Sequence, residues 1–407
     1  MLAGRFILVA FLFIAPFGNT QEKSPIQVST KREKGIEILQ KDSLFSIRFQ
    51  FRMQSRAGYL SRSDEDLTPE SFEFRIRRLR MAMRGFVYSS KLTYYIQLSF
   101  SRGDMDWEST NNSTFNTSPN IVRDAMIFYE PIKSLKFGFG QTKLPGNRQR
   151  VVSSGNLQFF DRSIVNATFT IDRDFGFFAT LDKEYFRIKG AITSGEGRNS
   201  NKSDKGLNYT GRVEILPFGK FTGDNEDCEG DLAREKSPKL AIAAGYNYNV
   251  HAVRQGGTIG NDLYSYVNME NLHADLLFKY RGWAILQEYT NRIVDNPFTV
   301  KTDDASKIRS VYTGFGMNTQ ISYLFKNNFE LAARYSFITP NKTVYDNAQF
   351  PSINEKRQEH LHLGVTKYLY GHRLKVQGNL LYQLTKDLRN VTQKGQFGAV
   401  FQIELGI

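Results

Sequence analysis

The chain has 407 residues and a single cysteine, and its 54 Lys and Arg against 41 Asp and Glu give a formal charge of +13 at pH 7. An apolar content of 40% is enough to bury a core, which excludes a globally disordered chain, and one cysteine excludes an internal disulfide framework. Beyond the N-terminus no apolar run reaches the roughly 20 residues of a membrane-spanning helix, so a helical membrane protein is also excluded.

The N-terminus has the layout of a secretory signal peptide. Arg5 supplies one positive charge, an apolar run extends from Phe6 to Phe17, and small and polar residues follow up to Gln21. The run is too short for a spanning helix, which weighs against the alternative of an uncleaved anchor. We therefore predict a signal peptide over residues 1–20 and a polar, periplasmic lead-in over residues 21–43.

The next segment, residues 44–59, alternates with a period of two. Phe45, Ile47 and Phe49 begin one series, and Arg48, Arg52 and Arg56 belong to the other. Successive side chains of a strand point to opposite faces, so this strand has one apolar face and one arginine face. In a soluble sheet the arginine face would meet solvent, whereas in a membrane barrel it would line the lumen. The export signal and the number of such segments favour the barrel.

The same alternation returns along the rest of the chain, at residues 92–101, 186–193, 209–215, 274–280, 331–337, 373–380 and 397–405. About sixteen such segments fit into the exported chain, inside the even-numbered range of bacterial barrels. The predicted fold is all-β: a transmembrane antiparallel β-barrel of about 16 strands over residues 44–407, with long extracellular loops. The long connections are expected at residues 103–120, 144–169, 219–238, 249–270, 295–310 and 340–358.

Several of these segments resemble the phosphate-selective porin O and P family. The resemblance begins with the basic strand FRIRRLR (residues 74–80), continues through Asp124-Ala125 and GFGQTKLP (residues 138–145), and then FDRS (residues 160–163). Later matches are Gly211-Arg212-Val213 with Pro217, Pro238-Lys239-Leu240, Ala274-Asp275 with Lys279-Tyr280, and Arg334-Tyr335-Ser336.

The resemblance implies a sixteen-stranded porin of the bacterial outer membrane, usually a homotrimer, that conducts small anions and in its best-known members prefers phosphate. The basic balance of the chain agrees with a path for small anions, or with a surface that faces lipopolysaccharide; nucleic acid is not expected for an exported chain. An alternative is a barrel that serves as a structural or receptor component of an envelope complex. An outer-membrane hydrolase is the third possibility.

The arginine row of residues 48–56 covers roughly 26 Å of strand, and a neighbouring row starts at Arg75 with a β-bulge expected near Arg77-Arg78. Arginine presents paired donors that match phosphate or carboxylate oxygens. The alternative is a charged lumen held by structural salt bridges to acids such as Glu73 and Asp124. The candidate pore-lining, anion-binding residues are Arg48, Arg52, Arg56, Arg75, Arg77, Arg80, Arg84, Lys143, Arg148, Arg150, Arg187, Lys189, Arg212, Arg334, Arg373 and Lys375.

A wide lumen needs a constriction in order to discriminate ions, because wall charges are screened within about 8 Å at physiological salt. The candidate is the segment from Lys143 to Ser163, which contains a strand-breaking Pro145-Gly146 pair. Folded inward, it would set Lys143, Arg148 and Arg150 opposite the arginine row. The alternative is an outer loop whose charges touch lipopolysaccharide.

Catalytic and metal-binding signatures are weak. His360 and His362 share a strand face but have no thiol or clear carboxylate partner, so we expect no metal site. The sequence has no phosphate-binding glycine loop between a strand and a helix, and no Gly-x-Ser-x-Gly. We therefore expect neither a cofactor nor enzymatic activity.

Overall fold

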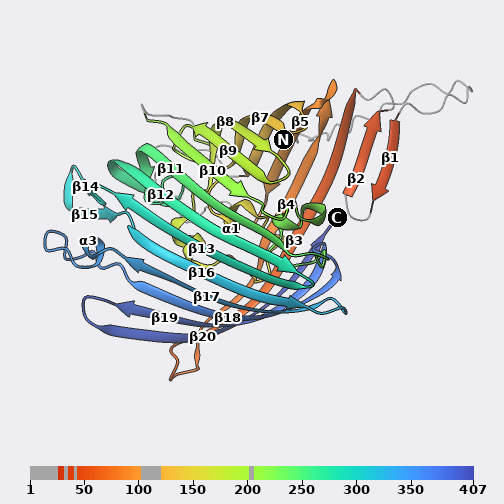
Figure 1. Cartoon of the computed structure of the whole chain (residues 1–407). Coiled ribbons are helices and arrows are strands. Elements are labelled where there is room, and N and C mark those ends of the chain that lie inside the picture. The colour runs from red at the N-terminus through yellow and green to blue at the C-terminus, as the bar shows by residue number, and fades with distance from the viewer. Residues whose placement is uncertain (1–25, 32–34, 41–43, 102–120, 201–205) are drawn as a thin grey trace, which may run out of the picture.

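The computed structural model describes residues 26–31, 35–40, 44–101, 121–200 and 206–407. Sixteen antiparallel strands close into one ring, in which neighbours in the chain pair and β20 returns to pair with β3 (Figure 1). The predicted all-β barrel is confirmed. Its strands are β3 (Phe45–Ser61), β4 (Pro69–Val87), β5 (Ser89–Ser99), β6 (Val122–Ile132), β7 (Leu135–Lys143), β8 (Arg173–Asp182), β9 (Phe186–Thr193), β10 (Asn208–Ile215), β11 (Lys239–Arg254), β12 (Asp262–Tyr280), β13 (Trp283–Val294), β16 (Gly314–Leu324), β17 (Phe329–Pro340), β18 (Arg357–Tyr370), β19 (Leu374–Asp387) and β20 (Thr392–Gly406).

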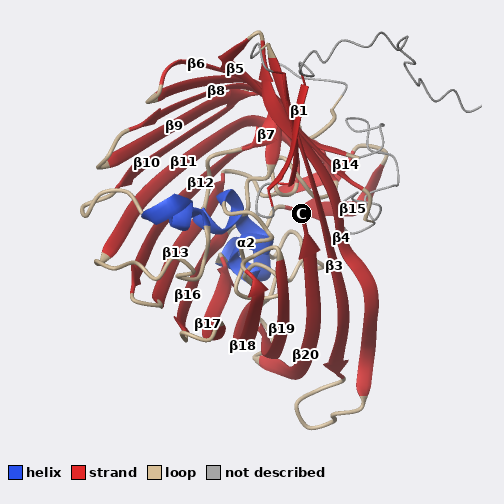
Figure 2. Cartoon of the chain, turned by 90° about the vertical axis from the view of Figure 1, so that its right-hand side faces the viewer, coloured by secondary structure: helices blue, strands red, loops and turns tan. Residues whose placement is uncertain are grey.

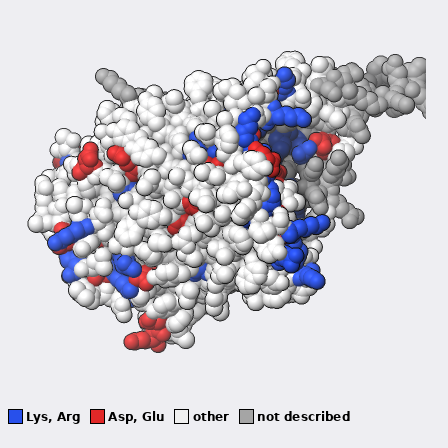
Figure 3. All heavy atoms as spheres, in the orientation of Figure 1, with Lys and Arg blue, Asp and Glu red and all other residues white. Residues whose placement is uncertain are grey.

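The two faces of the sheet differ in chemistry, as the alternation predicts. Across the β3–β20 seam, Gln54 pairs in register with Glu404 and both side chains are buried in the lumen, whereas Phe401, on the opposite face, is 50% exposed. Large apolar side chains such as Leu363 and Phe177 are likewise exposed on the outside. In the space-filling view the middle of the visible face is largely uncharged, and charged side chains gather toward the ends (Figure 3). This is the pattern of a barrel whose outer band contacts lipid.

The bulge expected near Arg77-Arg78 is present. The register between β3 and β4 shifts after the Gln54–Arg78 pair, so that Ser55 lies opposite Ile76 and Arg77 is the inserted residue. A bulge lets both strand segments around it send arginines to the same face. Arg75, Arg78, Arg80 and Arg84 therefore share the lumen side with the row of β3.

One end of the barrel has short turns, at residues 133–134, 183–185, 281–282 and 371–373, among others. The long connection expected at residues 219–238 is present between β10 and β11, but it lies at this short-turn end and not among the long connections of the other end. The long connection expected at residues 249–270 is wrong, because β11 runs to Arg254 and β12 begins at Asp262. The predicted connection at residues 103–120 lies outside the described residues.

A hairpin precedes the barrel, within the predicted lead-in. Strands β1 (Ile26–Lys31) and β2 (Gly35–Gln40) pair with each other, and β2 pairs with β3 from Ser46 to Phe49. Strand β20 ends opposite Arg52, so the hairpin continues the sheet where β20 stops. The predicted signal peptide lies outside the described residues.

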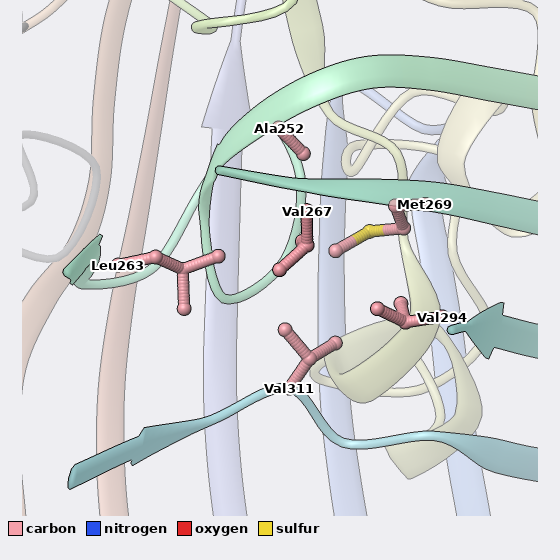
Figure 4. Close-up of a cluster of buried hydrophobic side chains, with 6 residues drawn as sticks. All are labelled: Ala252, Leu263, Val267, Met269, Val294 and Val311. Atoms are coloured by element: carbon pink, nitrogen blue, oxygen red, sulfur yellow. The ribbon is translucent and has the colours of Figure 1, made fainter. Parts of the chain in front are cut away.

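At the opposite end, a small apolar core anchors a second hairpin, β14 (Phe298–Lys301) with β15 (Asp304–Ser310). Its residues come from β11, β12, β13 and the connection after β15 (Figure 4): Ala252, Leu263, Val267, Met269, Val294 and Val311. Helix α3 (Lys342–Tyr345) lies in the connection between β17 and β18. Among the described residues, no helix combines the length and apolar character needed to cross a membrane.

The outward face predicts a stability test. Leu363 is exposed near the middle of β18, so Leu363→Arg should destabilise the barrel by about 2–4 kcal/mol if this band lies at the bilayer midplane. Urea titration of protein folded into lipid vesicles, followed by heat-modifiable gel mobility, measures this change. Leu363→Phe is the matched control and should cost little. Equal stability of the arginine and phenylalanine variants would contradict a lipid-facing position.

Candidate pore constriction

The connection between β7 and β8, residues 144–172, folds into the barrel. It carries two short helices, α1 (Arg148–Val151) and α2 (Ile164–Phe169), and α2 lies inside the ring of strands (Figure 2). Buried Leu144 and Ile171 hold its two ends together, and the Ser163 side chain caps α2 by accepting a hydrogen bond from the Asn166 N–H. This is the inward placement expected for Lys143 to Ser163.

Asp161 fastens this inward segment to the arginine wall, by which we mean the lumen-facing arginines of β3 and β4. Its carboxylate accepts hydrogen bonds from Arg56 at 2.8 Å, Arg78 at 2.6 Å and Arg77 at 3.2 Å. Burial by itself raises the pKa of Asp161, but the three guanidinium charges outweigh burial and hold that pKa well below its usual value. The carboxylate therefore stays ionised and bonded throughout the neutral range.

Further along the same wall, the segment is held through Ser154. Its hydroxyl accepts from Arg52 at 2.8 Å and from Arg80 at 3.1 Å, while Arg52 also lies 3.6 Å from Glu404. From β19, buried Lys375 donates to the backbone oxygens of Gly155 and Leu157, at 2.9 and 2.8 Å. Much of the predicted arginine row thus serves to position the inward segment.

Arg148 does not face the arginine row, so this part of the expectation is wrong. Its guanidinium bonds Asp275 of β12 at 2.6 Å and also bonds Glu214 of β10. Arg212 bonds the same two carboxylates, so two cations and two anions balance inside a buried cluster. A buried charge needs such partners to offset its desolvation. Arg148 and Arg212 are therefore anchors of the segment.

A second inward segment comes from the short-turn end. Residues 216–238 include the 3-10 helix η3 (Thr222–Asp227), and Glu229 within them accepts from the Gln149 side chain at 2.8 Å and from the Gln158 N–H at 2.9 Å. Lys279 of β12 fixes this segment by donating to the backbone oxygens of Cys228 and Gly230. The two segments enter from opposite ends of the barrel and bond to each other in the lumen.

Cations gather where the inward segment faces strands β6 to β8. Within this group, Arg173 bonds Asp124 at 3.0 Å, Arg198 lies 3.6 Å from Asp172, and Arg150 bonds Asp172 as well. Asp124 and Asp172 are among the carboxylates that bond the group. The cations are Arg123, Lys143, Arg150, Arg162, Arg173 and Arg198.

Like charges crowd together in this cationic cluster. Burial lowers the pKa of Arg150 well below its usual value, and four neighbouring guanidinium groups lower it further. Burial, followed by the charge of Arg78, lowers the pKa of Arg162 to about 9, while Glu229 and Asp161 oppose the shift. Guanidinium does not give up its proton in proteins, so both shifts mark charges that are costly to bury, and at Arg150 the neighbouring cations add to that cost.

The remaining predicted residues lie apart from this cluster. Arg75 bonds Glu73, Arg187 bonds Asp182 and Glu226, and Arg373 donates to the backbone oxygen of Ile407. Arg334 is buried and donates to the Asp161 backbone oxygen at 2.9 Å. Arg48 pairs with Glu37 at 2.6 Å. Lys189 is in register with Arg212, and Arg84 lies over Tyr95.

Sequence reasoning missed Arg78, Arg123, Arg162, Arg173 and Arg198. Arg78 could have been found, because the predicted bulge returns it to the lumen face. Arg162 stands within the predicted constriction segment, inside FDRS. Arg123 and Arg173 lie at the start of strands in which the alternation is short, and Arg198 lies in a connection. The two-residue period therefore gives little indication that these three side chains face the lumen.

Comparison with known proteins agrees with this geometry. A sequence profile of the phosphate-selective porin O and P family matches residues 47–250, half of the chain. The chain belongs to this family. It is a porin of the bacterial outer membrane, and the family points to a channel rather than an enzyme.

Solved structures share the fold at low sequence identity. An anion-selective porin from Comamonas acidovorans aligns with a TM-score of 0.54 and 10% identity, over 89% of this chain and 100% of that chain. The outer membrane channel DcaP of Acinetobacter baumannii gives 0.52 and 10%, over 93% and 99%. OmpT of Vibrio cholerae, in its trimer form, gives 0.53 and 11%, over 89% and 99%. No curated protein matches the sequence.

Among the described residues of this porin, no group of three or more His, Cys, Asp or Glu side chains is placed to hold a metal ion. The rings of His360 and His362 lie 6.0 Å apart, on one face of β18 as expected. His362 is buried between Phe159 and Phe160 of the inward segment, each 5.7 Å away. His362 therefore packs against the segment.

The Asp161 contacts predict a local change. Asp161→Asn should loosen residues 157–163 without unfolding the barrel, because three guanidinium groups lose their shared anion. Amide hydrogen exchange at pH 7 should show several-fold faster exchange in this stretch, with heat-modifiable mobility kept. Asp303→Asn, in an exposed turn, is the control.

The depressed pKa also sets a pH window. In the unfolded chain the pKa of an Asp is about 3.9. When folding lowers this pKa, the ionised carboxylate stabilises the folded state above about pH 3.9, and this stability is lost as the pH falls through the folded-state pKa. Residues 157–163 of the wild type should therefore keep their protection at pH 4 and lose it only well below. Loss between pH 6 and pH 5 would contradict the Asp161 contacts.

Proposed function

We propose that this porin is a passive, water-filled pore that favours small anions. The observation that carries the proposal is the cationic cluster of Arg123, Lys143, Arg150, Arg162, Arg173 and Arg198, where the inward segment lies against strands β6 to β8. A positive field in a narrow, partly desolvated passage raises the local concentration of anions and lowers that of cations. The arginine wall of β3 and β4 extends this field along the lumen.

Phosphate is among the anions we propose, because guanidinium groups present paired donors that match its oxygens. We also propose that the apolar outer band contacts lipid, that the outer rim contacts lipopolysaccharide, and that the long connections opposite the short turns are extracellular. Short turns of such barrels face the periplasm, which supports this orientation.

Charge removal in the cationic cluster tests the selectivity. Lys143→Gln and Arg162→Gln keep hydrogen-bond donors for the backbone oxygens of Val151 and Val152 while they remove two charges. The chloride-to-potassium permeability ratio, from the reversal potential in a salt gradient, should fall several-fold toward one in the double variant. Block of the chloride current by inorganic phosphate should weaken in parallel.

Two controls sharpen this test. Lys301→Gln removes an exposed charge on the β14–β15 hairpin and should leave the ratio unchanged. Wild-type selectivity should also decline at 1 M salt, where screening acts within about 3 Å. A double variant with wild-type ion preference would contradict the assignment of the cluster, and a wild-type pore without anion preference would contradict the proposed function.

We further propose a homotrimer. The support is the family, together with a structural neighbour that is described in a trimer form. Native mass spectrometry of the protein in mild detergent should give three copies. A monomer under conditions that keep the barrel folded would remove this proposal and leave the pore untouched.

A further inference from the structure

A cavity of about 590 Å³ lies at the short-turn end, apart from the cationic cluster. It is lined by side chains from β2 to β7. Two lumen-facing rows cross it. In the first row, Thr93 of β5 lies between its register partners Phe86 of β4 and Phe128 of β6. In the second row, Arg84 of β4 lies between its register partners Arg48 of β3 and Tyr95 of β5. Three aromatic rings and several charges therefore share one wall.

Most of the charges in this cavity are already neutralised. Arg48 bonds Glu37 at 2.6 Å, and Lys136 bonds Glu130 at 2.6 Å while its ammonium lies 5.4 Å from the centre of the Phe128 ring. Arg84 differs from both. Arg84 is exposed as a residue, and its guanidinium lies over the Tyr95 ring at 5.2 Å. Among the described residues no carboxylate lies within ion-pair distance of Arg84.

We propose that this cavity is a binding subsite for small aromatic carboxylates, with the carboxylate on Arg84 and the ring against Phe86, Tyr95 and Phe128. The guanidinium fork matches both oxygens of a carboxylate, and it is held on an aromatic face. The rings provide the apolar surface that a solute with a planar body buries. This subsite, here called the aryl-acid subsite, deepens the proposed anion pore by naming a class of solute.

The chemistry of the aryl-acid subsite favours an organic acid over inorganic phosphate. Phosphate gains from several converging donors, whereas Arg48 and Lys136 are occupied by Glu37 and Glu130. A phosphate ion also gains nothing from the three rings. A carboxylate without a ring would use Arg84 alone, so the aromatic body should supply a measurable part of the affinity.

The test compares two fluorinated probes by ¹⁹F NMR on the full chain in detergent: 4-fluorobenzoate, and trifluoroacetate as a carboxylate without a ring. The wild type should bind 4-fluorobenzoate more tightly than trifluoroacetate. Arg84→Gln should weaken 4-fluorobenzoate binding about tenfold, the scale of one hydrogen bond to a charged group. Tyr95→Leu should weaken 4-fluorobenzoate more than trifluoroacetate.

The matched control is Arg62→Gln. Arg62 is an exposed arginine in the connection between β3 and β4, at the opposite end of β4 from Arg84, and it bonds Asp66. This variant should keep wild-type binding of both probes. Equal binding of the two probes by the wild type, or equal losses in Arg84→Gln and Arg62→Gln, would overturn the proposal.

Two further readouts keep the outcome interpretable. Heat-modifiable mobility shows whether each variant folds, and if Arg84→Gln does not fold, Tyr95→Leu decides by itself. Binding needs no conductance, so the two proposals can fail separately. A chain that binds 4-fluorobenzoate without anion preference contradicts only the proposed pore function, whereas an anion-selective chain that does not discriminate between the probes contradicts only the aryl-acid subsite.

Discussion

Pairing between β20 and β3, from Gly398 opposite Leu60 to Gly406 opposite Arg52, leaves neither strand with an open edge along this length. Lipid offers no hydrogen bonds to backbone N–H and C=O groups, so a sheet that crosses a membrane has to close on itself. Closure then requires each strand to send apolar side chains outward and polar side chains inward. The alternation of β3 and the exposed outer row that includes Leu363 and Phe401 follow from this requirement.

Closure also creates a polar lumen that has to be filled or hydrated. The inward segment of residues 144–172 brings backbone groups and short helices into this space, and buried polar groups are costly without partners. The arginine wall provides those partners through Asp161 and Ser154, and the cluster of Arg148 and Arg212 provides them on the far side. Many arginines in this porin are therefore structural before they are functional.

This division of roles explains why a count of pore-wall arginines is a poor guide to selectivity. Three guanidinium groups share the one carboxylate of Asp161, so their charge is matched only in part within about 3 Å. Arg150 has four other guanidinium groups close enough to lower its pKa further, beyond the effect of burial. Arg84 has no carboxylate partner among the described residues, so its charge remains available at the short-turn end.

The sequence by itself determined the strands, the two faces of the sheet and the bulge at Arg77, because a period of two is a local property that each strand carries in its own residues. It also indicated that residues 143–163 leave the strand pattern, since Pro145-Gly146 interrupts it.

Only the tertiary structure decided which cations are matched by carboxylates. Arg56 meets Asp161, and Arg148 meets Asp275, through separations of 105 and 127 residues that no local pattern records. The position of residues 216–238 was decided in the same way. Whether a long connection folds into the lumen depends on the partners that closure of the barrel brings to face it, and here Lys279 and the first inward segment supply them.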